Sequence, residues 1–385
     1  MNNNSTNGEW LDIKRGIETI CKKFPESYWK TLDQKRAYPT NFVNTLTKSG
    51  YLSILIPEQY GGAGLPLRAA SVILEEIHRC GANGAACHAQ MYIMGSLLKH
   101  GSEKLKQKYL PDIASGKIRL QAFGVTEPSS GSDTLSIKTR AKKLGNKFLI
   151  NGQKVWTSRA EHSDLILLLT KTSDSEEQQK NLSLFLIDMR PHLNKSIIIK
   201  PIRTMINHSS TEIFFDNLEV DEDCLVGSLG SGFKYILDGM NAERILIASE
   251  CIGDAKYFIE KSKSYANDRK VFGRPIGRNQ SIQFPIANAY ANTRAAELMV
   301  KEACSLFDSN KKCGEESNLA KLLSADASWQ AADVAMQTFG GFAFSEEYNI
   351  ERKFRETRLY RIAPVSTNMI LAFISHKVLG MPRSY

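Results

Sequence analysis

The sequence predicts a multidomain α+β protein in which a helical region, a β region and a second helical region follow one another. Apolar residues recur three and four positions apart over residues 10–117, and again from Gly232 onward, which is the period of an amphipathic helix. Between Leu120 and Leu225, short β-prone runs are separated by turn residues. Because strands and helices do not alternate, a doubly wound α/β sheet is excluded.

The N-terminal region is expected to be entirely helical. Its apolar periodicity is clearest over 69–79 and 95–110. The segment 57–66, with sequence PEQYGGAGLP, is rich in glycine and proline, so we expect a loop that no helix can cross.

The middle region is expected to consist of short strands. Lys147–Ile150 followed by Asn151-Gly152 predicts a hairpin turn, because Asn-Gly favours the positive φ angles of a type I′ turn. The charged run 173–180 is expected to be a solvated loop between strands. Further strands are predicted at 165–170, 182–187, 196–202 and 212–218.

A glycine cluster at the end of the β region, Gly227-Ser-Leu-Gly-Ser-Gly232, has two interpretations. Its amides could hold a phosphate where the next helix begins, or the cluster could be a flexible connection. No Gly-x-Gly-x-x-Gly follows a strand, so a nicotinamide-type Rossmann site is not expected.

Composition narrows the class of protein. The 385 residues are 42% hydrophobic, which suits two or three domains with a packed core. No apolar run is long enough for a membrane span, and no secretion signal is legible. The seven cysteines are scattered without pairing motifs, which predicts reduced thiols in a cytoplasmic protein and no zinc or other metal site.

The charge balance is basic, with 50 Lys plus Arg against 41 Asp plus Glu and a net charge of +9. A nucleic-acid-binding protein would carry a clustered basic stripe, whereas the basic runs here are short, so nucleic acid is not an expected partner. A solvated cationic surface and a site for a small phosphate-bearing ligand both agree with the charge.

Two segments of the β region carry candidate chemistry. Gln121–Asp133, QAFGVTEPSSGSD, crowds small hydroxylated residues around a proline and a glycine, and Asn151–Ser158, NGQKVWTS, follows about 20 residues later. Phe123 and Trp156 each lie beside hydroxyl donors and could sandwich a planar heterocycle in an apolar slot with a polar edge.

Together with RKVFGRPI at 269–276, Gln280, QTFGGFAF at 337–344 and ERKFRE at 351–356, these segments resemble the acyl-CoA dehydrogenase family of flavoproteins. The resemblance covers most of the chain. It implies an N-terminal helical domain (1–119), a middle β-barrel domain (120–228) and a C-terminal four-helix bundle (229–385). It also implies an FAD-dependent oxidoreductase of fatty acid metabolism, a homodimer or homotetramer, that converts an acyl-CoA to its trans-2-enoyl-CoA and passes electrons to an electron-transferring flavoprotein.

The resemblance assigns site residues by position. Ser132 is expected near the flavin pyrophosphate and the CoA arm, and Trp156 over one face of the flavin ring. Met240 and Arg244 are expected to contact the substrate. The residues that the resemblance places against FAD are Phe123, Val125, Thr126, Ser132, Trp156, Ser158, Arg269, Phe272, Gln280, Gln337, Gly340 and Gly341. Those from Arg269 onward would reach the FAD of a neighbouring subunit.

The catalytic base departs from the commonest pattern of the family. Most members supply a glutamate from a C-terminal loop, but here Pro364 occupies that place in RIAPVST. A minority branch, which includes isovaleryl-CoA and long-chain enzymes, uses a helical glutamate just before an arginine, and Glu243-Arg244 matches it. Glu243 shares a helix face with Met240 and Ile247, and a carboxylate on an apolar stripe costs free energy unless it is paired or functional.

Pro364 also removes a backbone N–H that, in the family, helps hold the thioester carbonyl, unless Val365 supplies one instead. Two other functions therefore stay open. A flavin oxidase or monooxygenase on the same fold, such as an acyl-CoA oxidase or a nitroalkane-oxidase-like enzyme, would reoxidise rapidly in air. A flavin-bearing binding protein without turnover would show no bleaching by any acyl-CoA.

Overall fold

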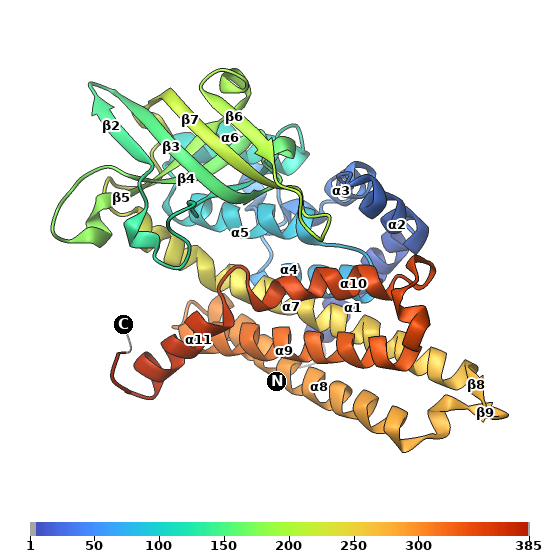
Figure 1. Cartoon of the computed structure of the whole chain (residues 1–385). Helices are drawn as coiled ribbons and strands as arrows, with labels where there is room; N and C mark the ends of the chain where they lie inside the picture. The colour runs from blue at the N-terminus through green and yellow to red at the C-terminus, as the bar shows by residue number, and fades with distance from the viewer. Residues whose placement is uncertain (1–4, 384–385) are drawn as a thin grey trace. The chain divides into compact units, whose positions relative to one another are not determined.

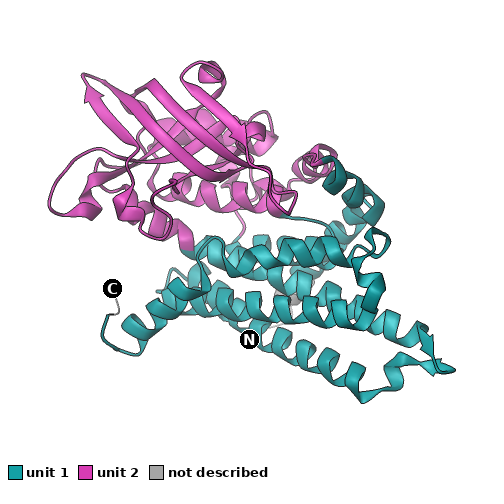
Figure 2. Cartoon of the chain, viewed as in Figure 1, with its two compact units in different colours: residues 1–35, 66–84, 241–385 teal, residues 36–65, 85–240 magenta. Residues whose placement is uncertain are grey.

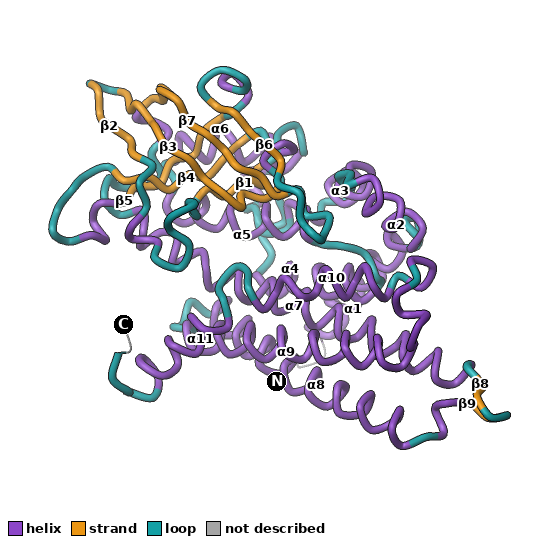
Figure 3. The backbone as a smooth tube through the Cα atoms, in the orientation of Figure 1, coloured by secondary structure: helices purple, strands orange, loops and turns teal. Residues whose placement is uncertain are grey.

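The computed structural model describes residues 5–383, and the chain folds into two compact units (Figures 1 and 2). Unit 1 is assembled from Met1–Lys35, Pro66–Gly84 and Asn241–Tyr385, and unit 2 from Arg36–Leu65 and Ala85–Met240. The predicted fold class is confirmed, with helices first, a curled sheet next and helices again at the end of the chain (Figure 3). The division into three domains at 119 and 228 stays a prediction.

Unit 2 is built on a seven-stranded sheet with the order β1-β4-β2-β3-β7-β6, in which β5 also pairs with β4. β1 and β2 each pair with β4 in parallel, and the other neighbours are antiparallel. The strands are β1 (Leu120–Gly124), β2 (Arg140–Leu144), β3 (Lys147–Ser158), β4 (Leu165–Lys171), β5 (Leu182–Asp188), β6 (Ile197–Pro201) and β7 (Ser210–Asp221).

Strand β4 shows why the middle of the chain is so apolar. Leu165 and Leu167 pack into one core with residues of helices α5 (Ala85–His100) and α6 (Glu103–Ser115), whereas Ile166 and Leu168 pack into a second core on the other face of the sheet. Both faces of the strand are therefore buried, and an unbroken apolar run replaces the alternation of a half-exposed strand.

The predicted helical periodicity over 95–110 is confirmed, but it spans two helices in the structure. α5 ends at His100, and α6 begins after Ser102, whose hydroxyl accepts a hydrogen bond from the Leu105 amide at 3.2 Å. A serine in this position caps the free amides of the next helix, so the apolar periodicity continued across a real boundary.

The predicted hairpin turn at Asn151-Gly152 is also wrong. Strand β3 runs through both residues, and the β2–β3 hairpin turns at Gly145-Asn146, where Gly145 has a φ of +61°. Asn151-Gly152 lies at a register shift between β3 and β7. A Cβ on Gly152 would come within 2.5 Å of Thr139 Oγ1, so a close approach, and not a turn, requires this glycine.

The glycine cluster 227–232 is packed against β5. A Cβ on Gly232 would lie 2.6 Å from the Ser183 carbonyl carbon, and the Gly230 amide donates to Ser183 Oγ at 2.8 Å. The cluster is therefore a tightly packed connection into helix α7 (Gly232–Asp268), which removes the argument for a phosphate site there.

Unit 1 is helical. A core of Ala255, Phe258, Ala331 and Ala335 lies between α7 and α9, where small residues allow the long helices to pack closely. Its helices are α1 (Ser5–Cys21), α2 (Glu26–Lys35), α4 (Leu67–Arg79), most of α7, α8 (Gln280–Asp308), α9 (Gly314–Phe339), α10 (Ile350–Arg358) and α11 (Thr367–Phe373). A short hairpin of β8 (Lys270–Val271) and β9 (Arg274–Pro275) joins α7 to α8, and α3 (Thr40–Lys48) belongs to unit 2.

Candidate functional site

The candidate residues fall into separate groups, of which the first lies in unit 2 around the ends of β1 and β3. The Thr126 carbonyl accepts a hydrogen bond from the Val155 amide at 2.9 Å, and the Val125 carbonyl accepts one from Lys154 Nζ at 2.9 Å. The chain after β1 is thus fixed directly to β3. Phe123, Val125, Thr126, Trp156 and Ser158 are brought together in this way, as partly buried or exposed residues.

Trp156 combines exposure with backbone strain. Its side chain is 57% exposed and its φ is +61°, at a register shift between β3 and β7. Arg159 and Ser209, which are joined by a 2.7 Å backbone hydrogen bond, also have positive φ angles. For a bulky residue such a φ is a costly outlier, and it persists only where the surrounding structure imposes it, as at binding sites.

A buried ion pair stabilises the backbone of this group. Lys154 Nζ lies 2.8 Å from Glu127 Oε1, and both side chains are almost fully buried. Burial lowers the pKa of Lys154 to about 8, with Glu127 opposing. Burial acts to raise the pKa of Glu127, but the charge of Lys154 and hydrogen bonds from Lys138 and Thr139 lower it overall. The pair fixes the turn that follows Thr126.

The side chains of this group, which include an exposed indole and two hydroxyl groups, fit a planar heteroaromatic ligand. The Thr157 side-chain hydroxyl is buried and has no hydrogen-bond partner among the described residues. Thr157 is 1% exposed, so its hydroxyl faces the protein interior, whereas the Trp156 indole faces outward and is available to a ligand. Ser132 is exposed in the loop after Gly131, where a Cβ on the glycine would meet nothing within 4 Å.

The second group lies on α7 in unit 1. Glu243 is 6% exposed, and Ile247, one turn further along the helix, is also buried. Arg244 Nη1 donates to Asn241 Oδ1 at 2.9 Å, while its Nε has no partner among the described residues. Burial lowers the pKa of Arg244, and the charge of Glu243 opposes that shift. Met240 precedes this stretch at the end of unit 2 and is partly buried.

The loop that contains Pro364 also lies in unit 1. It connects a short 3₁₀ turn (Leu359–Arg361) to α11, whose first turn is capped by Ser366 Oγ accepting from the Met369 amide at 3.3 Å. Its carbonyl at Val365 accepts a 2.7 Å hydrogen bond from Lys321 Nζ. The sequence analysis gave no role to Lys321, which is fully buried.

The third group lies at the β8–β9 hairpin and the end of α9. The Arg269 guanidinium stands over the Phe342 ring at 5.6 Å, which joins the two motifs. Phe272 is fully exposed with a φ of +52°, and a Cβ on Gly340 or Gly341 would meet nothing within 4 Å. Gln280 and Gln337 are exposed as well. An open cationic and aromatic surface of this kind fits a nucleotide diphosphate.

The second and third groups are far apart on one chain. Glu243 is near the start of α7 and Arg269 follows its last residue, so roughly 38 Å of helix separates them at 1.5 Å per residue. Figure 1 shows the β8–β9 hairpin at the tip of the long helices of unit 1. A single chain cannot bring its own Arg269 to its own Glu243.

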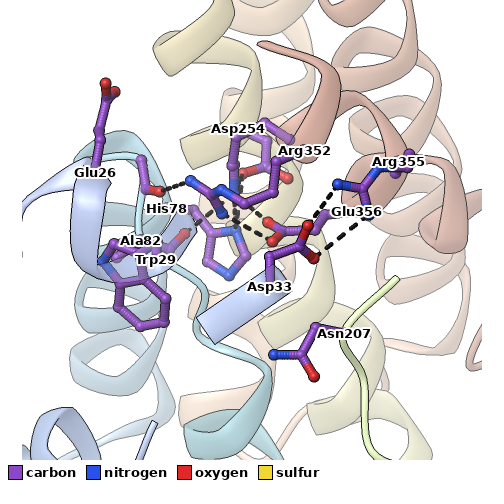
Figure 4. Close-up of polar contacts among 12 residues, drawn as sticks. Glu26, Trp29, Asp33, His78, Ala82, Asn207, Asp254, Arg352, Arg355 and Glu356 are labelled. Atoms are coloured by element: carbon purple, nitrogen blue, oxygen red, sulfur yellow. Dashed lines mark hydrogen bonds and ion pairs between the residues drawn. The ribbon is translucent and has the colours of Figure 1, made fainter. Parts of the chain in front are cut away.

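Sequence reasoning also missed a buried ionic network between α4, α7 and α10 (Figure 4). Lys353 Nζ lies 2.5 Å from Asp254 Oδ1 and 3.2 Å from Glu356 Oε2. His78 Nε2 accepts from the Gly84 amide at 2.9 Å, so its Nδ1 carries the proton that is donated to Asp254 Oδ1 at 2.8 Å. The part of the network that the sequence could have shown is the pairing within ERKFRE, whose charged residues lie three and four apart on one helix face.

Three further findings bear on function. A pocket of about 640 Å³ in unit 1 is lined by Tyr257, Lys256 and neighbouring residues, but by none of the candidate site residues. Within residues 5–383, no helix is long and apolar enough to cross a membrane, and no cluster of His, Cys, Asp and Glu could hold a metal ion. The seven cysteines form no disulfide with one another in the part of the chain that the structure describes.

Comparison with known proteins gives matches along the whole chain. Family models described as the acyl-CoA dehydrogenase N-terminal, middle and C-terminal domains match residues 9–117, 122–218 and 230–379. An acyl-CoA dehydrogenase of Bacillus subtilis is 32% identical over 376 residues, which cover 97% of this chain and 98% of that protein. Cyclohex-1-ene-1-carbonyl-CoA dehydrogenase of Syntrophus aciditrophicus is 33% identical over 354 residues, covering 91% and 85%.

A solved structure gives the same picture. The complex of glutaryl-coenzyme A dehydrogenase with glutaryl-CoA superposes with a TM-score of 0.92 at 27% identity, and the match covers 100% of this chain and 98% of that one.

Proposed function

The chain belongs to the acyl-CoA dehydrogenase family, whose members are oxidoreductases acting on CH–CH bonds, and from this premise we propose that it oxidises the Cα–Cβ bond of an acyl-CoA thioester to a trans-2-enoyl-CoA. A CoA thioester is supported by the relatives that act on cyclohex-1-ene-1-carbonyl-CoA and glutaryl-CoA. The observation that carries the proposal is the buried carboxylate of Glu243 beside Arg244 on α7.

FAD is the proposed cofactor, and the residues present fit it. Trp156, with Phe123, Val125, Thr126 and Ser158, would hold the flavin ring, and the indole of Trp156 is exposed for this contact. Ser132 would face the pyrophosphate and the CoA arm. When bound, FAD supplies the oxidant that accepts the Cβ hydrogen as a hydride.

Glu243 is the proposed base. Its carboxylate would accept the α-proton of the thioester. Pro364 cannot perform this role, because its side chain has no carboxylate. At 6% exposure the Glu243 side chain is largely shielded from bulk water. Arg244 and Met240 are the proposed substrate contacts next to it.

The proposed assembly is a homodimer or homotetramer. Arg269, Phe272, Gln280, Gln337, Gly340 and Gly341 cannot meet Glu243 of the same chain, because α7 holds the two groups about 38 Å apart. Each group would then complete the site of a neighbouring subunit.

The proposed electron acceptor is an electron-transferring flavoprotein, and the net charge of +9 suits an acidic partner. A place in fatty acid metabolism follows from the substrate class. The cytoplasmic location stays a prediction, supported by seven cysteines that form no disulfide within the described residues.

Anaerobic titration of the purified flavoprotein with a panel of acyl-CoAs, followed by the flavin absorbance, tests the proposal. We expect bleaching by one class of acyl chain. Glu243→Gln should keep FAD and lose flavin reduction, whereas Glu260→Gln, an exposed glutamate on the same helix, should behave as wild type. Failure of every acyl-CoA to bleach the flavin would overturn the proposal, and rapid reoxidation in air would favour the oxidase alternative.

A further inference from the structure

Lys321 on α9 is a buried cation without a carboxylate partner among the described residues. Its side chain has no exposed surface, and the acceptor of its Nζ is the Val365 carbonyl at 2.7 Å. Burial of an ammonium group without a counter-ion costs free energy, so such a residue is retained for what it does to its neighbours.

The charges around Lys321 make this region cationic. Burial lowers the pKa of Lys321 to about 8, and the charges of Arg244 and Arg361 act in the same direction, while Cys251 and Asp326 oppose. Asp326 is paired with Arg361, with Oδ1 at 3.1 Å from Nε. The Cys251 thiol is fully buried, which raises its pKa well above the ordinary value, so it carries no negative charge. An electron-rich group is therefore the species that this region would stabilise.

The hydrogen bond from Lys321 fixes one peptide plane of the Pro364 loop. The Val365–Ser366 peptide is trans, so its N–H points away from its C=O, and hence away from Lys321. No acceptor for the Ser366 amide is found among the described residues. A carbonyl that accepts from a cation also polarises its own peptide and makes that N–H a stronger donor.

We propose that Lys321 is a positioning residue, which, through the Val365 carbonyl, directs the Ser366 amide as a hydrogen-bond donor to the thioester oxygen of the substrate. This inference rests on the proposed function. It places a donor next to Pro364, which has no N–H of its own. The negative charge that develops on the thioester oxygen as the α-proton leaves would then be stabilised by Ser366 N–H.

Two substitutions test the proposal in the flavin-loaded protein. Lys321→Met removes the cation, and Ser366→Pro removes the donor at a residue whose φ of −64° already suits proline. Each should lower the rate of flavin reduction by about 10²–10³-fold, the usual effect of losing one such donor. The double variant should be no slower than Ser366→Pro alone, because Lys321 acts through that amide. Lys321→Arg should recover part of the rate, and Lys301→Met, an exposed lysine on α8, should have none of these effects.

A second readout separates positioning from folding. Acetoacetyl-CoA has an acidic α-proton, and its bound enolate gives a charge-transfer band with oxidised flavin. Plotted against pH, this band should have a midpoint at least one unit higher in Lys321→Met and in Ser366→Pro than in wild type. The Tm of Lys321→Met should not fall below wild type by more than that of Lys301→Met does. Ser366→Pro also removes the hydroxyl that caps α11, so its rate, midpoint and Tm are compared with those of Ser366→Ala, which loses only the cap.

Wild-type midpoints and rates in both variants would overturn the role of Lys321 and leave the proposed function standing. Additive losses in the double variant would also overturn it, since the two residues would then act separately. Failure of the wild-type protein to be reduced by any acyl-CoA would instead count against the proposed function itself. If Lys321→Met does not fold, Ser366→Pro with a wild-type rate and midpoint still refutes the proposal.

Discussion

At the scale of single residues, the buried pair of Lys154 and Glu127 illustrates how a costly interaction supports a site. Two charges are removed from water in unit 2, and the carboxylate recovers part of that cost by accepting from the backbone amides of Lys138 and Thr139 at 2.6 and 2.9 Å. Lys154 in turn binds the Val125 carbonyl. The pair therefore connects the proposed flavin-binding backbone to β3.

The two partners of this pair should respond unequally to substitution. Glu127→Gln leaves Lys154 buried without its counter-ion and should cost about 3–5 kcal/mol of unfolding free energy, whereas Lys154→Met should cost less because the carboxylate keeps its two amides. Urea unfolding followed by circular dichroism measures both. Glu219→Gln breaks an exposed pair with Lys147 and serves as the control, with no measurable change expected. Equal costs for the two buried substitutions would contradict the asymmetry.

At the scale of elements, helix α10 is held by charged residues that are buried, although its charged sequence motif does not suggest burial. Burial acts to raise the pKa of Glu356, but the charges of Arg352 and Lys353 lower it to about 2. The Arg352 guanidinium donates to Glu356 Oε1 at 2.8 Å and to the Gly81 carbonyl at 2.7 Å. The helix is therefore joined to α7 by the ion pair of Lys353 with Asp254, and to the chain after α4 by the hydrogen bond from Arg352 to the Gly81 carbonyl.

Acid should weaken this attachment. Because the pKa of Glu356 is about 2 in the folded state and 4.5 as the ordinary value, its stabilisation is complete above pH 4.5 and is lost as the pH falls toward 2. This contribution is on the order of 3 kcal/mol. Urea unfolding of wild type and Glu356→Gln at a series of pH values measures it, and the two stabilities should converge as the pH falls from 4.5 to 2. A constant difference between them would contradict the assignment. The charged and titratable groups that interact with Glu356 are Arg352, Lys353, Tyr257 and Tyr360.

The sequence predicted the elements well where one physical signal dominates. The four β-prone runs from Leu165 to Leu218 are strands β4 to β7, and the two most apolar, β4 and β5, are buried on both faces. Asn151-Gly152 failed because the Asn-Gly pattern reports only a tolerance of unusual φ, which a bulge uses as readily as a turn. Two helices begin where a side chain accepts hydrogen bonds from their first amides. Ser102 caps α6 in this way, and the Asp308 carboxylate caps α4 from 241 and 240 residues away along the chain.

The site was predictable only in part, because a sequence pattern reports local signals and not contacts between residues that are distant in the chain. Glu243 stands out in the sequence because a carboxylate interrupts an apolar helical stripe, a local signal. Lys321 gives no such signal, since its burial and its bond to Val365 depend on a loop 44 residues further along. His78 and Lys353 are 275 residues apart, so their shared contact with Asp254 was beyond any pattern of spacing.

At the scale of the whole molecule, the length of α7 decides how a complete site can be assembled. Glu243 and Arg269 lie about 38 Å apart along one helix, and both are proposed to act on the same flavin and substrate. The proposed symmetric assembly would resolve this conflict, because it would present the Arg269 of one subunit to the Glu243 of the next.

This arrangement predicts complementation between two defective chains. Glu243→Gln and Arg269→Ala homo-oligomers should each be inactive or flavin-poor, but a mixed oligomer contains sites that combine Glu243 of one chain with Arg269 of the other. In each mixed dimer one of the two sites is intact, so the purified mixed dimer should recover about one half of the sites, and unpurified random pairs about one quarter. Co-expression with two affinity tags, tandem purification of the mixed oligomer and measurement of flavin reduction by the active acyl-CoA provide the test. The same mixing with Arg278→Ala in place of Glu243→Gln controls for dilution of the Arg269 defect.

If purified mixed oligomers gain no activity over the parents, Arg269 and Glu243 do not share an intersubunit site, because α7 leaves no other way for one flavin to contact both.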